Sequence, residues 1–78
     1  MIEKNEIIKI IEDIDLGINV NENDFNKTLK EIGLDSLDTF NLISEIETVF
    51  NKKISDDSFV KIKSLNDLLN LLNNVEEV

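Results

Sequence analysis

The chain has 78 residues, with 17 acidic side chains against 8 lysines and no arginine, so its formal net charge is −9. This balance argues against binding to nucleic acid or to an anionic membrane surface, because both require clustered Lys and Arg. The absence of Cys and His excludes disulfides, the usual zinc ligands and any Ser-His or Cys-His catalytic pair. The length fits a single domain over residues 1–78, and we expect neither an enzyme nor a dedicated metal site.

Hydrophobic periodicity predicts helix along most of the chain, beginning with a first helix over residues 3–14 that ends at Asp15-Leu16-Gly17. The residues after it, 17–35, form a long connection in which Asp24 can cap a short turn. Apolar side chains throughout this connection indicate an ordered loop that crosses the domain. The apolar stripe of the first helix is Ile7, Ile8, Ile11 and Ile14. The loop residues expected to be buried are Ile18, Val20, Phe25, Leu29, Ile32 and Leu34.

The second helix, ending at Phe50, has the strongest pattern. Asp35 is a good N-cap, and Asp38 three residues later completes a pair that resembles a capping box. Asn51-Lys52-Lys53 closes the helix and brings positive charge to the negative end of its dipole. The predicted inward stripe is Leu37, Phe40, Ile43, Ile46, Val49 and Phe50.

Two shorter elements follow. Ser55-Asp56-Asp57 starts a short helical turn that carries Phe59 and Val60, and Ser64 with Asp67 caps a final helix. Leu65, Leu68, Leu69 and Leu72 of that helix face inward, and residues 73–78 are expected to fray. The predicted fold is all-α: a small four-helix bundle of three longer helices and one short helix, with a long ordered loop between helices one and two.

The N-terminal residues 1–6 are polar and lead into a helix, unlike a signal peptide. Apolar runs never exceed two residues, far short of the roughly 20 that span a membrane. We therefore expect a soluble, cytoplasmic protein without membrane insertion.

One residue stands out as a site for chemistry. Ser36 directly follows the turn Gly33-Leu34-Asp35 and takes the first position of the strongest helix. Unpaired amides and the positive dipole end at such a position favour an attached phosphate. The alternative is that Ser36 only shares the N-capping role with Asp35.

The run Gly33-Leu34-Asp35-Ser36-Leu37-Asp38, followed by an amphipathic helix to Phe50, resembles the acyl carrier protein family. The similarity extends over residues 3–73. Lys53-Ile54-Ser55-Asp56 is similar to the segment before the short third helix of the family, although the family usually has Pro where Ser55 stands. Ser64-Leu65-Asn66-Asp67-Leu68 resembles its capped last helix.

The resemblance implies that Ser36 carries 4′-phosphopantetheine, placed there from coenzyme A by a phosphopantetheinyl transferase. Its thiol would hold acyl intermediates as thioesters, fatty-acid biosynthesis being the default pathway, and the helical interior would part to shelter the acyl chain. A chain without Cys or His has no strong nucleophile of its own, which fits an imported sulfur. The alternatives are a dedicated carrier for a polyketide, aminoacyl or D-alanyl pathway, and an unmodified acidic helical adaptor.

Residues 31–51 contain five acids and no base. The resemblance implies a docking surface for acyl-transferring or elongating enzymes with basic patches, formed by Asp35, Leu37, Asp38 and Glu45. The carrier itself is expected to be a monomer. The alternatives are a merely solvated helix face and, for Leu37, a place in the buried stripe. The five acids are Glu31, Asp35, Asp38, Glu45 and Glu47.

The predicted solvent side of this helix reads Asp38, Asn41, Glu45 and Thr48. The family's general fatty-acid carriers commonly place acids at all four positions, so the two neutral residues point to a specialised pathway. Asp56-Asp57 could bind a divalent ion only loosely, because no stretch has the ligand spacing of an EF-hand loop.

Overall fold

The computed structural model describes residues 1–74, which form an all-helical fold without strands, as predicted. The elements are α1 (Lys4–Ile14), the 3-10 helix η1 (Glu22–Asn26), α2 (Ser36–Phe50), α3 (Asp56–Phe59) and α4 (Leu65–Asn74). The predicted fraying is wrong for Asn73 and Asn74, since both belong to α4. Asn73 exchanges two hydrogen bonds with the backbone of Ile2, at 2.8 and 3.2 Å. The rest of that prediction concerns residues 75–78, which lie outside the described part.

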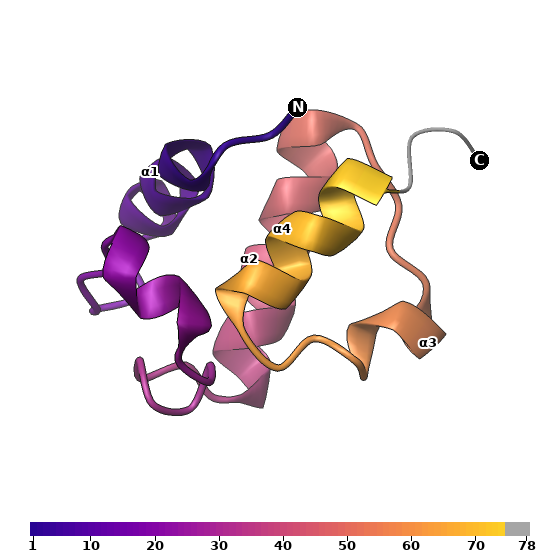
Figure 1. The fold of residues 1–78 in the computed structure, drawn as a ribbon. Helices are drawn as coiled ribbons and strands as arrows, with labels where there is room; N and C mark the ends of the chain where they lie inside the picture. Colours follow the sequence, from indigo (N-terminus) through magenta and orange to yellow (C-terminus); the bar gives the residue numbers. More distant parts are fainter. Residues whose placement is uncertain (75–78) are drawn as a thin grey trace.

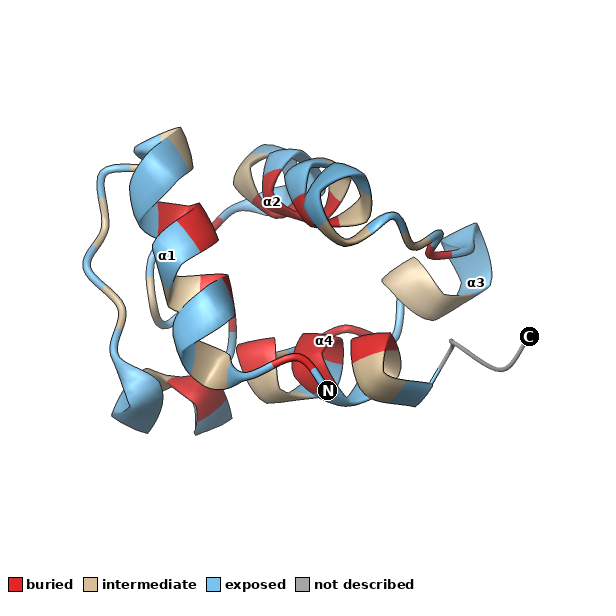
Figure 2. Cartoon of the chain, turned by 90° about the horizontal axis from the view of Figure 1, so that it is seen from above, coloured by how far each residue is buried: buried red, intermediate tan, exposed pale blue. Residues whose placement is uncertain are grey.

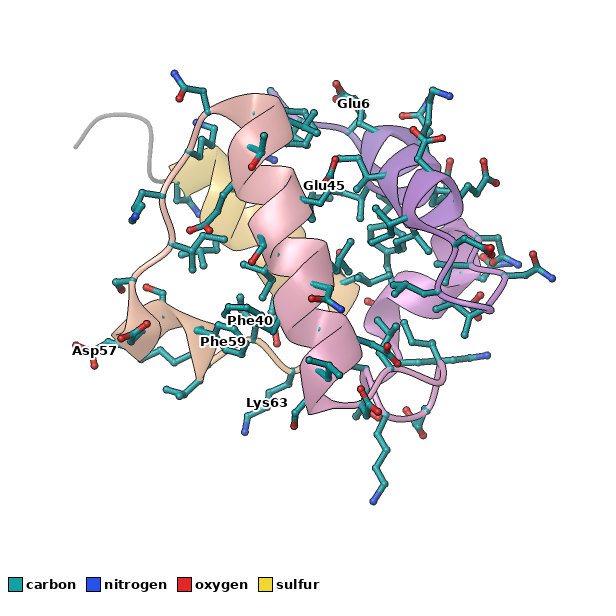
Figure 3. All side chains as sticks on the ribbon, turned by 180° about the vertical axis from the view of Figure 1, so that it is seen from behind. Glu6, Phe40, Glu45, Asp57, Phe59 and Lys63 are labelled. Atoms are coloured by element: carbon teal, nitrogen blue, oxygen red, sulfur yellow. The ribbon has the colours of Figure 1, made fainter. Side chains whose placement is uncertain are left out.

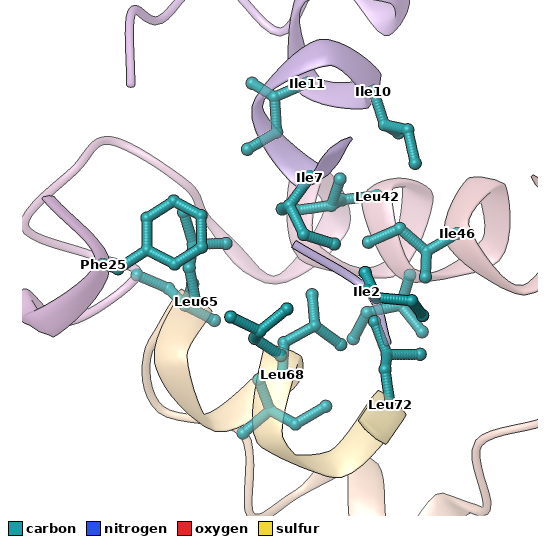
Figure 4. Close-up of a cluster of buried hydrophobic side chains, with 14 of the residues drawn as sticks. Ile2, Ile7, Ile10, Ile11, Phe25, Leu42, Ile46, Leu65, Leu68 and Leu72 are labelled. Carbon is teal, nitrogen blue, oxygen red and sulfur yellow. The ribbon is translucent and has the colours of Figure 1, made fainter. Parts of the chain in front are cut away.

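The three longer helices surround one core, and α3 lies beyond α2 and α4 at the end of the molecule opposite α1 (Figures 1 and 2). Buried positions of α1, α2 and α4 face one another across the interior (Figure 2). Figure 4 shows the side chains that meet there. The largest fully buried ones are Phe25, Ile7, Ile11, Leu42, Ile46, Leu65, Leu68 and Leu72. Each such side chain contributes about 1.5–3 kcal/mol, which outweighs the mediocre helix propensity of the isoleucines in α1.

The connection between α1 and α2 contains η1 and contacts the rest of the molecule at two places, η1 itself and residues 26–29. Phe25 is completely buried, and the Lys4 ammonium lies 5.5 Å from its ring centroid. Asn21 caps η1 by accepting from the Asn23 amide at 2.9 Å, while Asp24 accepts from the Asn21 amide at 3.1 Å. Asp24 therefore takes the third helical position of the cap and is not the N-cap itself.

The second place, residues 26–29, lies before Ser36 in the chain and is held by two hydrogen bonds. The Leu29 amide donates to the Lys63 carbonyl at 2.9 Å, and the Asn66 side-chain amide donates to Asn26 Oδ1 at 2.6 Å. These bonds link the loop to the segment that enters α4. The chain that approaches α2 is thus fixed to a second element.

The buried face of α2 differs from the predicted stripe. Phe40 and Val49 are 55% and 52% exposed, so their predicted place in the inward stripe is wrong. Leu37 is 67% exposed, which agrees with an apolar contact residue and not with the alternative of a buried stripe position. The buried residues of α2 are Thr39, Leu42, Ile43 and Ile46. Apolar residues occur almost all around this helix, and the positions of α1 and α4 decide which of them are covered. Thr39 is tolerated inside because its hydroxyl donates to the Asp35 carbonyl at 2.8 Å.

The remaining caps lie close to their predicted positions. Ser55 accepts from the Ser58 amide at 3.2 Å at the start of α3, and Ser64 accepts from the Asp67 amide at 3.2 Å before α4. The four predicted leucines of α4 are buried. Asn51 ends α2 as predicted, being its C-cap in a left-handed conformation with φ 55°, but the last turn itself has no basic residue. Within residues 1–74 no helix is long and apolar enough to cross a membrane.

Candidate functional site

A glycine turn sets the direction from which the chain enters α2. Gly33 has φ +98°, a conformation that side chains other than glycine rarely adopt. A Cβ at this position would lie 3.1 Å from Ile18 Cγ2. The next residue, Leu34, is buried, and its amide donates to the Leu29 carbonyl at 2.9 Å. Gly33 therefore serves both to turn the chain and to let it pass close to the loop.

Asp35 and Asp38 form the capping box that the sequence predicts. Asp35 Oδ1 accepts from the Asp38 amide at 2.8 Å, and Asp38 Oδ2 accepts from the Asp35 amide at 3.5 Å. The Thr39 amide also donates to the Asp35 carbonyl at 2.9 Å. The N-cap of α2 is therefore formed without Ser36, whose hydroxyl makes no hydrogen bond within the described residues.

Ser36 is exposed and lies at the rim of an open depression of about 450 Å³. Lys30 and Lys63 also line this depression. Neither lysine forms an ion pair within residues 1–74. The apolar part of the lining is Leu29, Leu34, Phe59, Val60 and Ile62. The exposed hydroxyl thus lies between solvent and a partly apolar groove.

Four of the five acids in residues 31–51 accept hydrogen bonds from backbone amides. Besides the capping pair, Glu31 accepts from the Thr28 amide at 2.8 Å, and Glu47 accepts from the Ile54 amide at 2.7 Å. Among residues 1–74, Glu45 is the one acid of the five with neither a hydrogen bond nor an ion pair. It projects from the edge of α2 that faces α1 (Figure 3).

The outermost line of α2 carries no charge. At helical spacing this line comprises Leu37, Asn41, Ser44 and Thr48. Leu37 is exposed beside Ser36, as a contact residue would be, whereas Asp38 and Glu45 lie on one flank. The predicted stripe of Asp38, Asn41, Glu45 and Thr48 therefore combines the outer line with this flank.

An aromatic pair on the other flank was missed by the sequence reasoning. The rings of Phe40 and Phe59 are stacked, with centroids 6.2 Å apart and planes inclined by 28° (Figure 3). The sequence contains no signal for this pair, because it does not reveal how α3 lies against α2. The same applies to Lys30 and Lys63, which come from segments far apart in the chain. No group of three acidic side chains gathers into a possible metal site within residues 1–74.

Comparisons with known proteins agree on one family. The family described as a phosphopantetheine attachment site matches residues 5–72. A protein of Ureaplasma parvum serovar 3 described as an acyl carrier protein homolog is 36% identical over 72 residues, covering 92% of this chain and 91% of its own. A Mycoplasma genitalium protein with the same description is 30% identical over 71 residues, covering 86% of this chain and 84% of its own.

A solved structure shows the same architecture. The crystal structure of an acyl carrier protein from Thermotoga maritima superposes with a TM-score of 0.80 at 28% identity, covering 94% of this chain and 86% of the other. The prosthetic group of this family is 4′-phosphopantetheine. From the matched residues, the similar relatives and the shared fold, the chain belongs to the acyl carrier protein family.

Proposed function

We propose that Ser36 is the attachment point of 4′-phosphopantetheine and that the protein carries acyl groups between enzymes without catalysing a reaction itself. The observation that supports this most is the unoccupied hydrogen-bonding capacity of the exposed Ser36 hydroxyl at the first position of α2, while Asp35 performs the capping. When attached, the group supplies a thiol that holds an acyl chain as a thioester. The chain offers no imidazole or thiol for catalysis.

The residues around Ser36 fit such a group. The amide end of α2 favours a phosphodiester electrostatically, and two lysines, Lys30 and Lys63, line the same groove as Ser36. The apolar lining beyond them, including Leu34 and Ile62, would shelter the first part of an acyl chain from water.

The proposed partners are a phosphopantetheinyl transferase and acyl-transferring or elongating enzymes with basic patches. Leu37 offers an apolar contact next to Ser36. Asp35 and Asp38 supply negative charge beside it, and Glu45 supplies a further charge farther along α2. Such charges mainly accelerate encounter and permit rapid release, which suits a carrier that visits several enzymes. We further propose that the protein is a monomer with a single domain over residues 1–78. It would be located in the cytoplasm and serve fatty-acid biosynthesis.

The attachment site is tested with coenzyme A, a broad phosphopantetheinyl transferase and intact-mass measurement. Wild type should gain one phosphopantetheine, and Ser36→Ala should gain none. The variant should keep its stability within about 0.5 kcal/mol, because Ser36 makes no hydrogen bond that the substitution would break. Ser44→Ala, on the same helix, is the control and should be modified like wild type. A wild type that never gains the group would favour the acidic adaptor, and a modified Ser36→Ala protein would place the site elsewhere.

The uncharged outer line of α2 favours a dedicated pathway as the second candidate function. Asn41→Glu/Thr48→Glu would add two exposed charges, each able to form an ion pair of about 0.2–1 kcal/mol. The kcat/KM of acyl loading and elongation by a general fatty-acid system should then rise by about twofold to thirtyfold. Asn70→Glu/Asn74→Glu adds the same charge on α4 and should change nothing. If wild type already performs like a general fatty-acid carrier and the added acids have no effect, the dedicated-pathway idea fails.

A further inference from the structure

The outer wall of the groove beside Ser36 is formed by α3 and the residues after it, and it is only weakly anchored. None of the four residues of α3 is buried among residues 1–74. The segment is held from its two ends, by the buried side chains of Ile54 and Ile62. The Ile54 amide adds one hydrogen bond, to Glu47 Oε2 at 2.7 Å. Between these anchors, Phe59 is the residue of α3 that packs against the core cluster.

Phe59 has a second neighbour outside the core. Its ring stacks on Phe40 of α2 at 6.2 Å, and the two rings lie side by side between α2 and α3 (Figure 3). Phe59 lines the groove, whereas Phe40 does not. Phe40 is 55% exposed and lies outside the cluster formed by the described buried residues. It therefore supports the Phe59 ring from the solvent side.

The opposite wall is much more firmly held. Leu29 and Leu34 are buried, and the Leu34 amide donates to the Leu29 carbonyl at 2.9 Å. Thr39 is bound to the Asp35 carbonyl through both its amide and its hydroxyl, at 2.9 and 2.8 Å. An acyl chain on the arm attached to Ser36 cannot displace this wall of the groove without breaking buried contacts. The position of the Phe59 ring therefore decides how far the chain can extend.

We propose that Phe59, held by Phe40, is a specificity-determining residue that restricts the sheltered cargo to short acyl chains. This inference rests on the proposed attachment of the arm at Ser36. The first methylenes of an acyl chain lie in the existing groove and leave water. Further methylenes must either separate the stacked rings or remain in solvent, so they add no stability to the closed protein.

The experiment compares acyl forms of wild type, Phe59→Ala and Phe40→Leu. Each protein is loaded by a phosphopantetheinyl transferase from butyryl-, octanoyl- or dodecanoyl-coenzyme A, and its melting temperature is compared with that of the form carrying the free thiol. For wild type, the temperature should rise with butyryl and then remain level. For Phe59→Ala, it should rise further with octanoyl, by at least about 3–6 °C, the shift that one sheltered methylene gives in a domain of this size.

The control variants separate the ring from general effects of truncation. Val49→Ala removes an apolar side chain of α2 that is about as exposed as Phe40 and does not line the groove. Its melting temperature should depend on acyl length as that of wild type does. Phe59→Leu should give an intermediate length dependence and serves as the test if Phe59→Ala does not fold. Phe40→Leu keeps the groove lining but removes the stack, so longer chains should be sheltered there too.

Two results would overturn the inference while leaving the proposed function intact. One is a wild-type melting temperature that keeps rising to dodecanoyl, and the other is an identical length dependence in wild type and both Phe59 variants. Intact mass checks the loading independently in every sample. A wild type that accepts no acyl-phosphopantetheine would overturn the proposed function and this inference together.

Discussion

Asp35 combines two roles, a hydrogen-bond acceptor at the start of α2 and a negative charge beside Ser36, and two substitutions separate them. Asp35→Ala removes both. It should lower the free energy of unfolding by about 1 kcal/mol (range 0.5–2), because the Asp38 amide loses the acceptor that it now has at 2.8 Å. In a domain of this size the melting temperature should fall by about 4–8 °C for each kcal/mol.

Asp35→Asn retains an acceptor oxygen and removes the charge. Asn ranks with Asp as an N-cap, and relief of repulsion in a chain of charge −9 offsets the lost interaction with the helix dipole, which is about 0.3–1 kcal/mol. The melting temperature should therefore stay close to that of wild type. If docking of the transferase uses the charge, both variants should be pantetheinylated about 1.5-fold to fivefold more slowly, the loss of one exposed ion pair.

The two measurements, thermal unfolding by circular dichroism and the kcat/KM of pantetheinylation, can refute the reasoning separately. If Asp35→Asn destabilises the protein as much as Asp35→Ala, the stabilisation comes from the charge and not from the acceptor. If Asp35→Asn is modified at the wild-type rate at low ionic strength, Asp35 has no part in docking.

Two further predictions concern the approach to this site. Gly33→Ala should destabilise the protein by about 1–3 kcal/mol in urea unfolding, because the backbone is at φ +98° and the new Cβ would crowd Ile18. Gly17→Ala, at φ +79° but in open space, should cost less, and an equal cost would show that the contact with Ile18 is unimportant. The pKa of Asp24 is lowered, chiefly by its hydrogen bond from the Asn21 amide and then by Lys27. A lowered pKa in the folded state means that the charged form stabilises the fold above the ordinary value of 3.8. The stability difference between wild type and Asp24→Asn should therefore be largest near neutral pH and should close as the pH falls below 3.8; a constant difference would contradict this.

The features that the sequence predicts correctly depend on neighbours in the chain. The box of Asp35 and Asp38, the caps at Ser55 and Ser64, and the leucines of α4 follow from spacings of three or four residues. These are local signals, and burial in the bundle only has to agree with them. The position of Ser36 at the start of α2 could be predicted in the same way, whereas its role as the attachment point comes from the family resemblance and stays a proposal.

The side of α2 that becomes buried is not a local property. Leu37, Phe40 and Val49 have the helical spacing of a core stripe, and so do Leu42, Ile43 and Ile46. The covered side depends on where α1 and α4 approach, and those approaches depend in turn on bonds such as that from Leu29 to the Lys63 carbonyl. For the same reason the groove and its aromatic wall could not be predicted, since their residues come from three separate segments.

The correction to α2 has a consequence for function. Leu37 and Phe40 lie outside the cluster of buried residues in the described chain, so the stability of the bundle does not require either of them to be apolar. Exposed apolar side chains are unfavourable in water, and both lie near the one exposed hydroxyl at the start of α2. One adjoins Ser36 directly, and the other supports the ring that bounds the groove. Under the proposed function, their apolar character is explained by a partner enzyme that contacts Leu37 and by the groove wall that Phe40 supports, and not by the folding of the chain.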